Sequence, residues 1–286
     1  MSHLYHYCST AAFHSIISTR SLWLSSLRQS NDRSEGRLVS EAVARLASIH
    51  GVNLETRGHL LSAVENLEGF YDGLGCCLSP EGDLLSQWRA YAEDGTGVSL
   101  GFSRAYLDWL VQSSGGQDID LSLLKVEYEP ETHNKLVLPV YTRLRELLES
   151  DEEICEDIPP ELSPESEEYA RLTELHGRLA VLTLLKAAMP ALHHVFLLKH
   201  HAFSEEKEWR LLHSFGWLPT NPCSFRPSAG RLIAYKACPL RESSNPSLLK
   251  IVLGPKHNTP VSVVENYLLQ HGFGRVEIVK SVAPYR

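Results

Sequence analysis

Apolar residues recur at every second position in short segments near both ends of the chain, and at helical spacing through much of its middle. The first segment, residues 4–8, is short, aromatic and apolar, and it predicts a strand. Ser9 and Thr10 then precede Phe13, Ile16 and Ile17, a pattern that predicts a capped helix. Similar short apolar segments predict further strands at 22–24, 74–79, 98–102, 123–128, 208–213, 231–235, 250–253 and 276–279.

Helical periodicity dominates the middle of the chain. Amphipathic helices are predicted at 35–50 and 56–70, the first with Leu38, Val43, Leu46 and Ile49 on its apolar side. Asp32 or Ser34, in the polar loop 31–35, is expected to cap that helix. Shorter helices are predicted at 83–91 and 260–271.

Residues 135–199 form a mainly helical section, interrupted or kinked at Pro190, whose helix reaches a last turn at Lys199, His200 and His201. The section includes an acidic connection, 149–168, with ten Asp or Glu and no Lys or Arg. Such a segment buries too little apolar surface to order itself. Strand signals on both sides of a helical insertion predict an α+β fold with a mixed or antiparallel sheet, in one domain that spans residues 1–286.

Composition narrows the classes of function. With 43% hydrophobic and 22% charged residues, the 286-residue chain has an ordinary globular composition. A net charge of −8 argues against a general binder of nucleic-acid backbones, which requires clustered Lys and Arg. The sequence does not open with a basic region followed by an apolar one, and no apolar run reaches the length that a membrane span needs, so neither a signal peptide nor a membrane partner is expected. Six Cys without a C-x-x-C pair indicate a reduced, cytoplasmic protein.

The stretch 199–214 is the main candidate for chemistry. On a strand, Glu206, Glu208 and Arg210 would share one face, while Trp209 and Leu211 would share the other. Two carboxylates beside an Arg suit a site that orients a polar substrate and stabilises a developing cation. A solvated acidic turn, with Trp209 as a core anchor, accounts for the same residues.

Two further groups of residues suggest a nucleotide site. His6 could hydrogen-bond a ribose hydroxyl while Tyr7 stacks on a planar ring, although a core histidine among aromatic residues is the simpler explanation. In the segment 84–92, Leu84 and Trp88 would anchor a helix and leave Ser86, Arg89 and Tyr91 toward a cleft. A Ser and an Arg there could hold a pyrophosphate, or the Arg could simply face solvent.

Metal binding is not expected. Histidines 193, 194, 200 and 201 form pairs two helical turns apart, about 10 Å, which is too far to share one ion. Cys76 and Cys77 lie in an apolar strand and should be inert. A Mg²⁺-dependent nuclease using Asp32, Glu35, Glu206 and Glu208 has the right residue types, but the spacing gives no reason for them to converge.

Several motifs together resemble a bacterial family, domain-of-unknown-function family 2971. They are Leu-Tyr-His-Tyr at 4–7, Leu-Trp-Leu-Ser at 22–25, Asn-Asp-x-Ser-Glu at 31–35, Leu-Leu-Ser-Gln-Trp-Arg-Ala-Tyr-Ala at 84–92, Gly-Thr-Gly-Val-Ser-Leu-Gly-Phe at 95–102, Phe-Ser-Glu-Glu-Lys-Glu-Trp-Arg at 203–210 and Pro-Tyr-Arg at 284–286. The resemblance runs from Leu4 to Arg286. It implies no activity, although members of this kind occur among bacterial and phage-conflict genes.

A more distant resemblance is to ADP-ribosyltransferases, in which a His or Arg lies on the first strand, a Ser or Tyr on a middle strand and a Glu on a late strand. His6, Ser79 and Glu208 match these positions, although the Ser-Thr-Ser motif of the family is absent. The resemblance implies a split sheet and NAD as the substrate, with His6 on the ribose and Glu208 stabilising an oxocarbenium-like transition state.

The same resemblance gives Glu206 the task of positioning or deprotonating an acceptor, which could be a protein or a nucleic acid. The expected function is an ADP-ribosyltransferase or NAD glycohydrolase of a toxin or phage-defence system. Tyr7, Ser79, Ser86, Arg89, Tyr91 and Arg210 would then contribute to NAD binding. The alternative is a non-catalytic nucleotide- or protein-binding module in which Glu208 pairs with Arg210 or Arg89.

Overall fold

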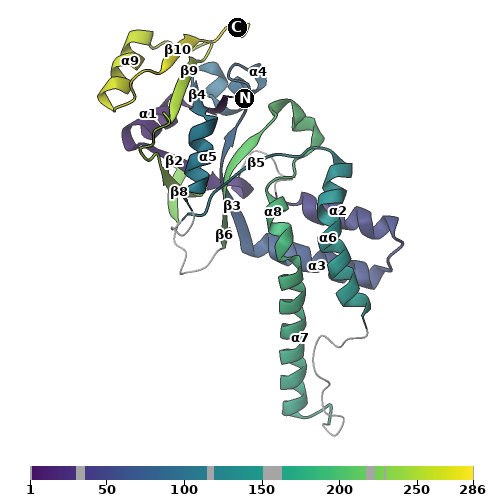
Figure 1. Cartoon of the computed structure of the whole chain (residues 1–286). Helices are drawn as coiled ribbons and strands as arrows, with labels where there is room; N and C mark the ends of the chain where they lie inside the picture. The colour runs from purple at the N-terminus through teal and green to yellow at the C-terminus, as the bar shows by residue number, and fades with distance from the viewer. Residues whose placement is uncertain are drawn as a thin grey trace. The chain divides into compact units, whose positions relative to one another are not determined.

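The computed structural model in Figure 1 describes residues 2–29, 36–114, 119–150, 163–216, 223–228 and 230–285. The chain divides into two compact units. The first contains Met1–Ser30, Gly73–Val126 and Ala202–Arg286, and the second contains Asn31–Asp72 and Glu127–His201. Strands dominate the first unit and helices the second, so the predicted α+β class is confirmed.

One sheet of the first unit has four strands in the order β1(His3–Cys8), β4(Val98–Ser103), β9(Leu248–Leu253) and β10(Glu277–Lys280). β4 is antiparallel to both β1 and β9, whereas β10 is parallel to β9, so the sheet is mixed. Alternate residues point to opposite faces of a strand. Leu4 and Cys8 accordingly enter the main core together with apolar residues of α1(Thr10–Thr19), α5(Arg104–Gln112) and α9(Val261–Gln270), while Tyr7 packs on the other face.

The other sheet of this unit has six strands and is antiparallel. Its order is β5(Ser122–Lys125), β6(Trp209–Gly216), β3(Tyr71–Leu78), β2(Ser21–Ser26), β8(Arg231–Pro239) and β7(Ser224–Ser228). Leu74, Cys76 and Leu78 of β3 and Leu211 of β6 belong to the same core as Leu4, so this core is built from both sheets. Neither β7 nor α5 is among the elements predicted from sequence.

The two sheets meet on β3. In its middle, Leu74 and Gly75 pair with Ser26 and Ser25 of β2. Just past its end, Ser79 exchanges two backbone hydrogen bonds with Tyr5 of β1, at 2.7 and 2.8 Å. The junction of the two sheets therefore lies at Tyr5 and Ser79, beside most of the residues predicted to form a site.

The connections around these strands follow from local sequence. Ser9 caps α1 as predicted, because its Oγ accepts a hydrogen bond from the N–H of Ala12 at 3.0 Å. The short helices of the unit are η1(Leu27–Gln29), α4(Leu85–Tyr91), η2(Glu93–Gly95) and η4(His201–Glu206). The backbone of Gly97 lies so close to the carbonyl oxygen of Cys8 that a Cβ would clash with it, which explains a glycine there.

The second unit contains α2(Leu38–Ile49), α3(Leu54–Phe70), α6(Pro130–Glu149), α7(Glu167–Ala188), η3(Met189–Ala191) and α8(Leu192–Val195). It thus combines the predicted helical insertion with residues 31–72. On α2, Leu38, Val43 and Leu46 are buried as predicted, but Ile49 is 68% exposed, so its assignment to the apolar side is wrong. Ile49 is the last residue of the helix, where the chain turns away at His50 and Gly51.

The ends of several helices differ from the predictions. α2 begins at Leu38, and the loop with Asp32 and Ser34 lies outside the described residues. Residues 151–162 of the acidic connection also lie outside them, but its last residues, Glu167 and Glu168, form the first turn of α7 under a cap from Ser166. Acidic side chains are favourable at that helix end, where the backbone N–H groups carry partial positive charge.

The segment before residue 200 is not a continuous helix. The interruption at Pro190 is confirmed, since α7 ends at Ala188 and η3 contains the proline. The helix predicted to run on to Lys199 is wrong, because α8 ends at Val195. The N–H of Lys199 instead donates to the carbonyl of Glu127 at 2.9 Å, which makes Leu198 an isolated bridge residue.

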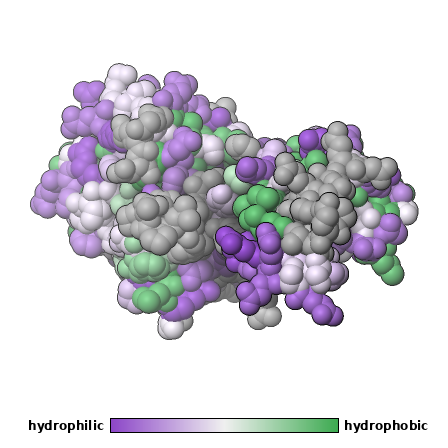
Figure 2. All heavy atoms as spheres, turned by 90° about the horizontal axis from the view of Figure 1, so that it is seen from below, coloured by the Kyte–Doolittle hydropathy of each residue, from purple (hydrophilic) through white to green (hydrophobic). Residues whose placement is uncertain are grey.

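Among the described residues, no helix combines the length and the hydrophobicity required to cross a bilayer. Figure 2 shows small groups of hydrophobic residues among mainly hydrophilic ones on the visible face. Exposed large apolar side chains include Leu175, Leu179 and Leu182, on the solvent side of α7. Their spacing of four and three residues puts these leucines along one side of the helix.

Candidate functional site

His6 occupies the point at which β1 leaves β3. If the pairing of Tyr5 with Ser79 continued, the carbonyl of Cys77 would accept from the backbone N–H of Tyr7. Instead this carbonyl lies 2.9 Å from Nδ1 of His6. A carbonyl can only accept, so Nδ1 carries the proton and Nε2 is left as an acceptor on a partly exposed ring. Burial lowers the pKa of His6, and the Cys77 carbonyl opposes this, so the neutral imidazole is favoured.

The protein is expected to lose stability as the pH falls below about 6.5, the usual pKa of histidine. Because the folded-state pKa of His6 is lowered, the unfolded chain binds a proton that the folded chain does not, and stability present above that pH is lost below it. His6→Gln should therefore reduce the slope, which is at most about 1.4 kcal/mol per pH unit for each such group. Urea denaturation at pH 7.5 and 5.5 measures it, with the exposed His59→Gln as the control. An unchanged slope in His6→Gln would contradict this assignment.

Tyr7 is buried on the opposite face of β1. Its hydroxyl donates to the carbonyl of Glu81 at 2.7 Å and accepts from the N–H of Leu84 at 2.9 Å. Its ring meets Trp88 edge to face, with 4.9 Å between centroids. Burial raises the pKa of this phenol. Tyr7 thus holds the segment before α4 in place, and His6 and Tyr7 point to opposite sides of the same strand.

Ser79, Glu206 and Tyr91 form a connected polar cluster next to Tyr7. Ser79 is buried; its Oγ donates to the backbone carbonyl of Glu206 at 3.0 Å and accepts from the N–H of Glu81 at 3.2 Å. The hydroxyl of Tyr91 donates to Oε1 of Glu206 at 3.2 Å, and the Glu206 residue is only 7% exposed. A buried carboxylate with a phenol donor is thereby fixed beside the junction of the two sheets.

Glu206 does not lie on the β6 face that the period-two pattern assigned to it. It is the last residue of η4, and Lys207 has a left-handed φ of 46°, so the alternation begins only after it. Lys207 itself forms an exposed ion pair with Glu81 at 2.9 Å. The turn of the backbone at Lys207, and not strand alternation, therefore sets the position of Glu206 relative to Glu208.

Glu208 and Arg210 form a buried, bidentate ion pair. Nε of Arg210 lies 2.7 Å from Oε1 of Glu208, and one terminal nitrogen lies 3.2 Å from Oε2. Their side chains are only 4% and 1% exposed. As predicted, Trp209 and Leu211 point to the main core from the other face. The interaction of Glu208 with Arg210 that the alternative hypothesis required is thus present.

His6 and Glu208 lie on opposite faces of these strands. Tyr5 pairs with Ser79, so these two side chains share a side, and His6 falls on the other side with Cys76 of the main core. The Sγ of Cys76 is 3.4 Å from Nδ1 of His6. Tyr7, Ser79, Tyr91 and Glu206 are linked as described, whereas His6 contacts Cys76 and Cys77, and the Glu208 carboxylate is near enough to contribute to the raised pKa of that same Cys76 thiol.

α4 presents the remaining candidates in different environments. Arg89 is exposed and stacks on the ring of Tyr285 at 5.2 Å. The Oγ of Ser86 is buried without a hydrogen-bond partner in the described part of the chain. Trp88 is fully buried as predicted, whereas Leu84 is half-buried and lies at the N-cap position before the helix.

Asp83 accepts several hydrogen bonds in the structure, but it is not among the candidate residues that the sequence analysis identified. Its carboxylate accepts hydrogen bonds from Nε1 of Trp88 at 2.7 Å, from the hydroxyl of Ser281 and from the N–H of Val282 at 2.8 Å. It therefore fastens the C-terminal segment to α4. An Asp five residues before a Trp is not a recognised motif, so the sequence offered only a weak signal.

Metal-binding and nucleophilic chemistry find no further support. Within the described ranges no group of three His, Cys, Asp or Glu could hold a metal ion. His201 forms an exposed pair with Glu129 at 2.9 Å, and Asp32 and Glu35 lie outside those ranges. Burial raises the pKa of Cys76 to about 12, so its thiol stays protonated.

Comparison with known proteins gives a partial family match and no activity. Residues 87–211 match the family described as Protein of unknown function (DUF2971). This supports the resemblance over less than half of the chain; the region includes Tyr91, Glu206, Glu208 and Arg210. No curated protein and no solved structure matches the chain significantly.

Proposed function

We propose that the protein uses NAD as a substrate, as an ADP-ribosyltransferase or an NAD glycohydrolase. Glu208 would stabilise the oxocarbenium-like transition state as nicotinamide leaves, and Glu206 would position or deprotonate the acceptor. The proposal extends to an ADP-ribosyltransferase-like split sheet, to a cytoplasmic location and to a role in a toxin or phage-defence system.

The observation that carries this proposal is the cluster of Ser79, Tyr91 and Glu206, which lies beside the junction on β3. In the sequence, only Lys207 separates Glu206 from Glu208. A serine, a phenol and two carboxylates supply both donors for ribose hydroxyls and negative charge for a developing cation. β3 pairs with β2 of one sheet, and Ser79, directly after β3, pairs with Tyr5 of the other sheet, which supports the split-sheet arrangement. The proposed direct contact of His6 with ribose has less support, because His6 faces the other way; it would act by fixing β1 to Cys77.

A second candidate is a nucleotide- or protein-binding module without catalysis. The bidentate ion pair favours it, because Arg210 already neutralises the charge that Glu208 would offer to a transition state. Turnover through Glu208 requires that the bound substrate compete with Arg210 for its oxygens. Binding without turnover requires no such exchange.

Nicotinamide release from NAD by purified protein separates the two candidates. Glu208→Gln is expected to lower the rate by at least about 100-fold if the carboxylate acts on the transition state. Because this change also removes the negative charge of the buried ion pair with Arg210, the variant should be less stable, so it is assayed well below its measured Tm. Glu206→Gln and Tyr91→Phe test the neighbouring cluster, and the exposed Glu205→Gln is the matched control.

Calorimetric titration with NAD completes the test. Release by the wild type that is lost in Glu208→Gln supports the enzyme. Saturable binding without release supports the module, and equal release by wild type and Glu208→Gln rejects the catalytic role of Glu208. Neither binding nor release at millimolar NAD would reject both nucleotide proposals.

A further inference from the structure

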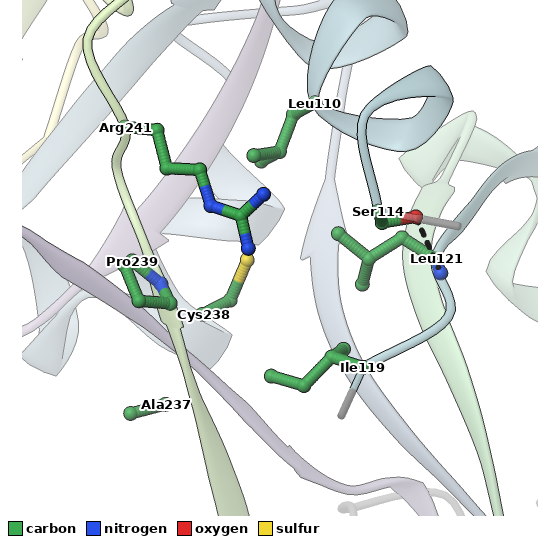
Figure 3. A pocket seen from close by; sticks show the side chains of 8 residues that line it. All are labelled: Leu110, Ser114, Ile119, Leu121, Ala237, Cys238, Pro239 and Arg241. Carbon is green, nitrogen blue, oxygen red and sulfur yellow. Dashed lines mark hydrogen bonds between the residues drawn. The ribbon is translucent and has the colours of Figure 1, made fainter. Parts of the chain in front are cut away.

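A cavity and a row of exposed leucines take no part in the cluster proposed to bind NAD. The cavity, of about 460 Å³, lies between the end of α5, the residues before β5 and the end of β8 (Figure 3). Polar and apolar groups share its wall, with Arg241 and Ser114 among aliphatic side chains, so its chemistry favours no single class of ligand. The leucines lie on α7, and their spacing is regular enough to identify what would cover them.

α7 leaves a row of leucines open to solvent. The helix contacts α3 and α6 of its own unit, and Figure 1 shows it extending past the ends of both. Leu175, Leu179 and Leu182 are 48%, 43% and 50% exposed. Leu172, which is half-buried, precedes Leu175 by three residues and continues the row. Apolar residues at alternating intervals of three and four are the pattern of a coiled-coil seam, which a second helix covers.

Opposite charges stand at the two ends of this row. Glu168 comes four residues before Leu172, and Lys186 comes four residues after Leu182, so both continue the same spacing. Both side chains are exposed. At 1.5 Å per residue, the face from Glu168 to Lys186 is about 27 Å long. It is acidic at its start, apolar along its middle and basic at its end.

The leucines of this face can pair with those of a second copy of the same chain. In the antiparallel register centred on position 177, Leu175 of one copy would face Leu179 of the other. The same register would place Leu172 opposite Leu182. Every leucine of the row therefore meets a leucine, and the apolar seam has no unmatched layer.

The charges select the antiparallel direction. In the register centred on position 177, Glu168 of each copy would lie beside Lys186 of the other. A parallel pair would instead bring Glu168 to Glu168 and Lys186 to Lys186, so like charges would repel at both ends. Arg178 would lie near the centre of the antiparallel pair, but its charge is balanced within its own helix, where its guanidinium is 2.6 Å from the carboxylate of Glu174.

We propose that two copies of this chain associate through α7 as an antiparallel helix pair. The leucines form the seam, and the charged ends set the direction. One helix pair of this length buries less than about 1,200 Å² in total, the low end of specific interfaces. The dimer is therefore weak and reversible, with a Kd of roughly 10–100 µM. This association does not depend on the proposed use of NAD.

Sedimentation equilibrium of the full-length protein, from about 1 to about 300 µM, tests the association. The wild type should follow a monomer–dimer equilibrium. Leu175→Gln combined with Leu179→Gln should raise the Kd by at least about 100-fold, because it takes four leucines out of each dimer. Both positions are exposed, so the variant should unfold at the wild-type temperature.

Val181→Gln is the matched control. Val181 is 52% exposed on another side of α7, so the same kind of change there should leave the Kd within about twofold. A wild type that stays monomeric over the whole range would reject the proposal. A dimer that survives the double leucine variant, or that Val181→Gln weakens equally, would show that a different surface forms it.

Cysteine cross-linking under mild oxidation reads the direction of the pair. A mixture of Leu172→Cys and Leu182→Cys should give a disulfide-linked heterodimer, since these positions face each other. Leu172→Cys alone should not cross-link, because its two copies would lie about 15 Å apart along the helices. The wild type, which has cysteines of its own, gives the background. A cross-link in Leu172→Cys alone, or none in the mixture, would overturn the antiparallel register.

Discussion

Replacement of Arg210 by Met is expected to destabilise the protein by about 3–5 kcal/mol, because the change removes the bidentate guanidinium partner of a buried carboxylate, Glu208. Methionine retains much of the apolar volume of the arginine side chain, so lost packing accounts for little of the effect. Urea denaturation at pH 7.5 measures the loss as a shift in the midpoint at constant slope.

Two comparisons distinguish the loss of this charge partner from a general defect. The double variant Glu208→Met with Arg210→Met should recover most of the lost stability, since apolar residues of similar volume can replace a buried ion pair at little net cost. Acidic pH should also narrow the gap between Arg210→Met and the wild type, because the carboxylate can then take up a proton. Arg210→Met that unfolds at the wild-type midpoint would show that the pair contributes nothing to the fold.

Replacement of Trp88 by Ala should cost about 3–5 kcal/mol. Trp88 is fully buried, packs edge to face on Tyr7 and donates its indole N–H to Asp83. Its removal leaves a large cavity under the outer face of β1 and takes one of three donors from a carboxylate. Guanidinium denaturation reports the global loss.

Trp88→Phe separates the two contributions. It keeps most of the aromatic packing and removes only the N–H, so a smaller loss of about 1–3 kcal/mol is expected. Hydrogen exchange at Val282, whose N–H binds Asp83 at 2.8 Å, should quicken in both variants. Unchanged exchange there would contradict the role of Asp83 in fastening the C-terminal segment.

Sequence reasoning succeeded where the causes are local. The strands at 4–8, 74–79 and 208–213 lie within about three residues of β1, β3 and β6, because alternation and β-branched or aromatic content act over a few residues. The cap at Ser9 depends on four consecutive residues and was correct. The face of Arg210 followed directly from its position two residues after Glu208.

The errors arose where distant contacts decide the outcome. The apolar run at 195–198 looked helical, but the carbonyl and N–H of Glu127, some seventy residues earlier, take its backbone partners instead. β7 carries an Arg and a Pro in five residues, so it lacked a strand pattern and forms by pairing with β8. The pairing of Ser79 with Tyr5, which sets the junction of the sheets, has no signature in either segment.

The same distinction between local causes and distant contacts applies to the residues of the candidate site. Glu208 and Arg210 could be paired from sequence alone, and so could the opposite orientations of His6 and Tyr7, had strand alternation been applied to Leu4, His6 and Cys8. The link from Tyr91 to Glu206 could not, because 115 residues separate them.

The strand order of the mixed sheet also constrains how the chain is made. β1 emerges first from the ribosome, but its partner β4 follows about ninety residues later and β9 only near residue 250. Until β4 is made, the edge of β1 that pairs with it has no partner, and until β9 is made the other edge of β4 has none. During translation the first strand therefore stays unpaired for about ninety residues, and β4 in turn waits for β9 in the last quarter of the protein, periods in which chaperone contact would protect these strands from aggregation.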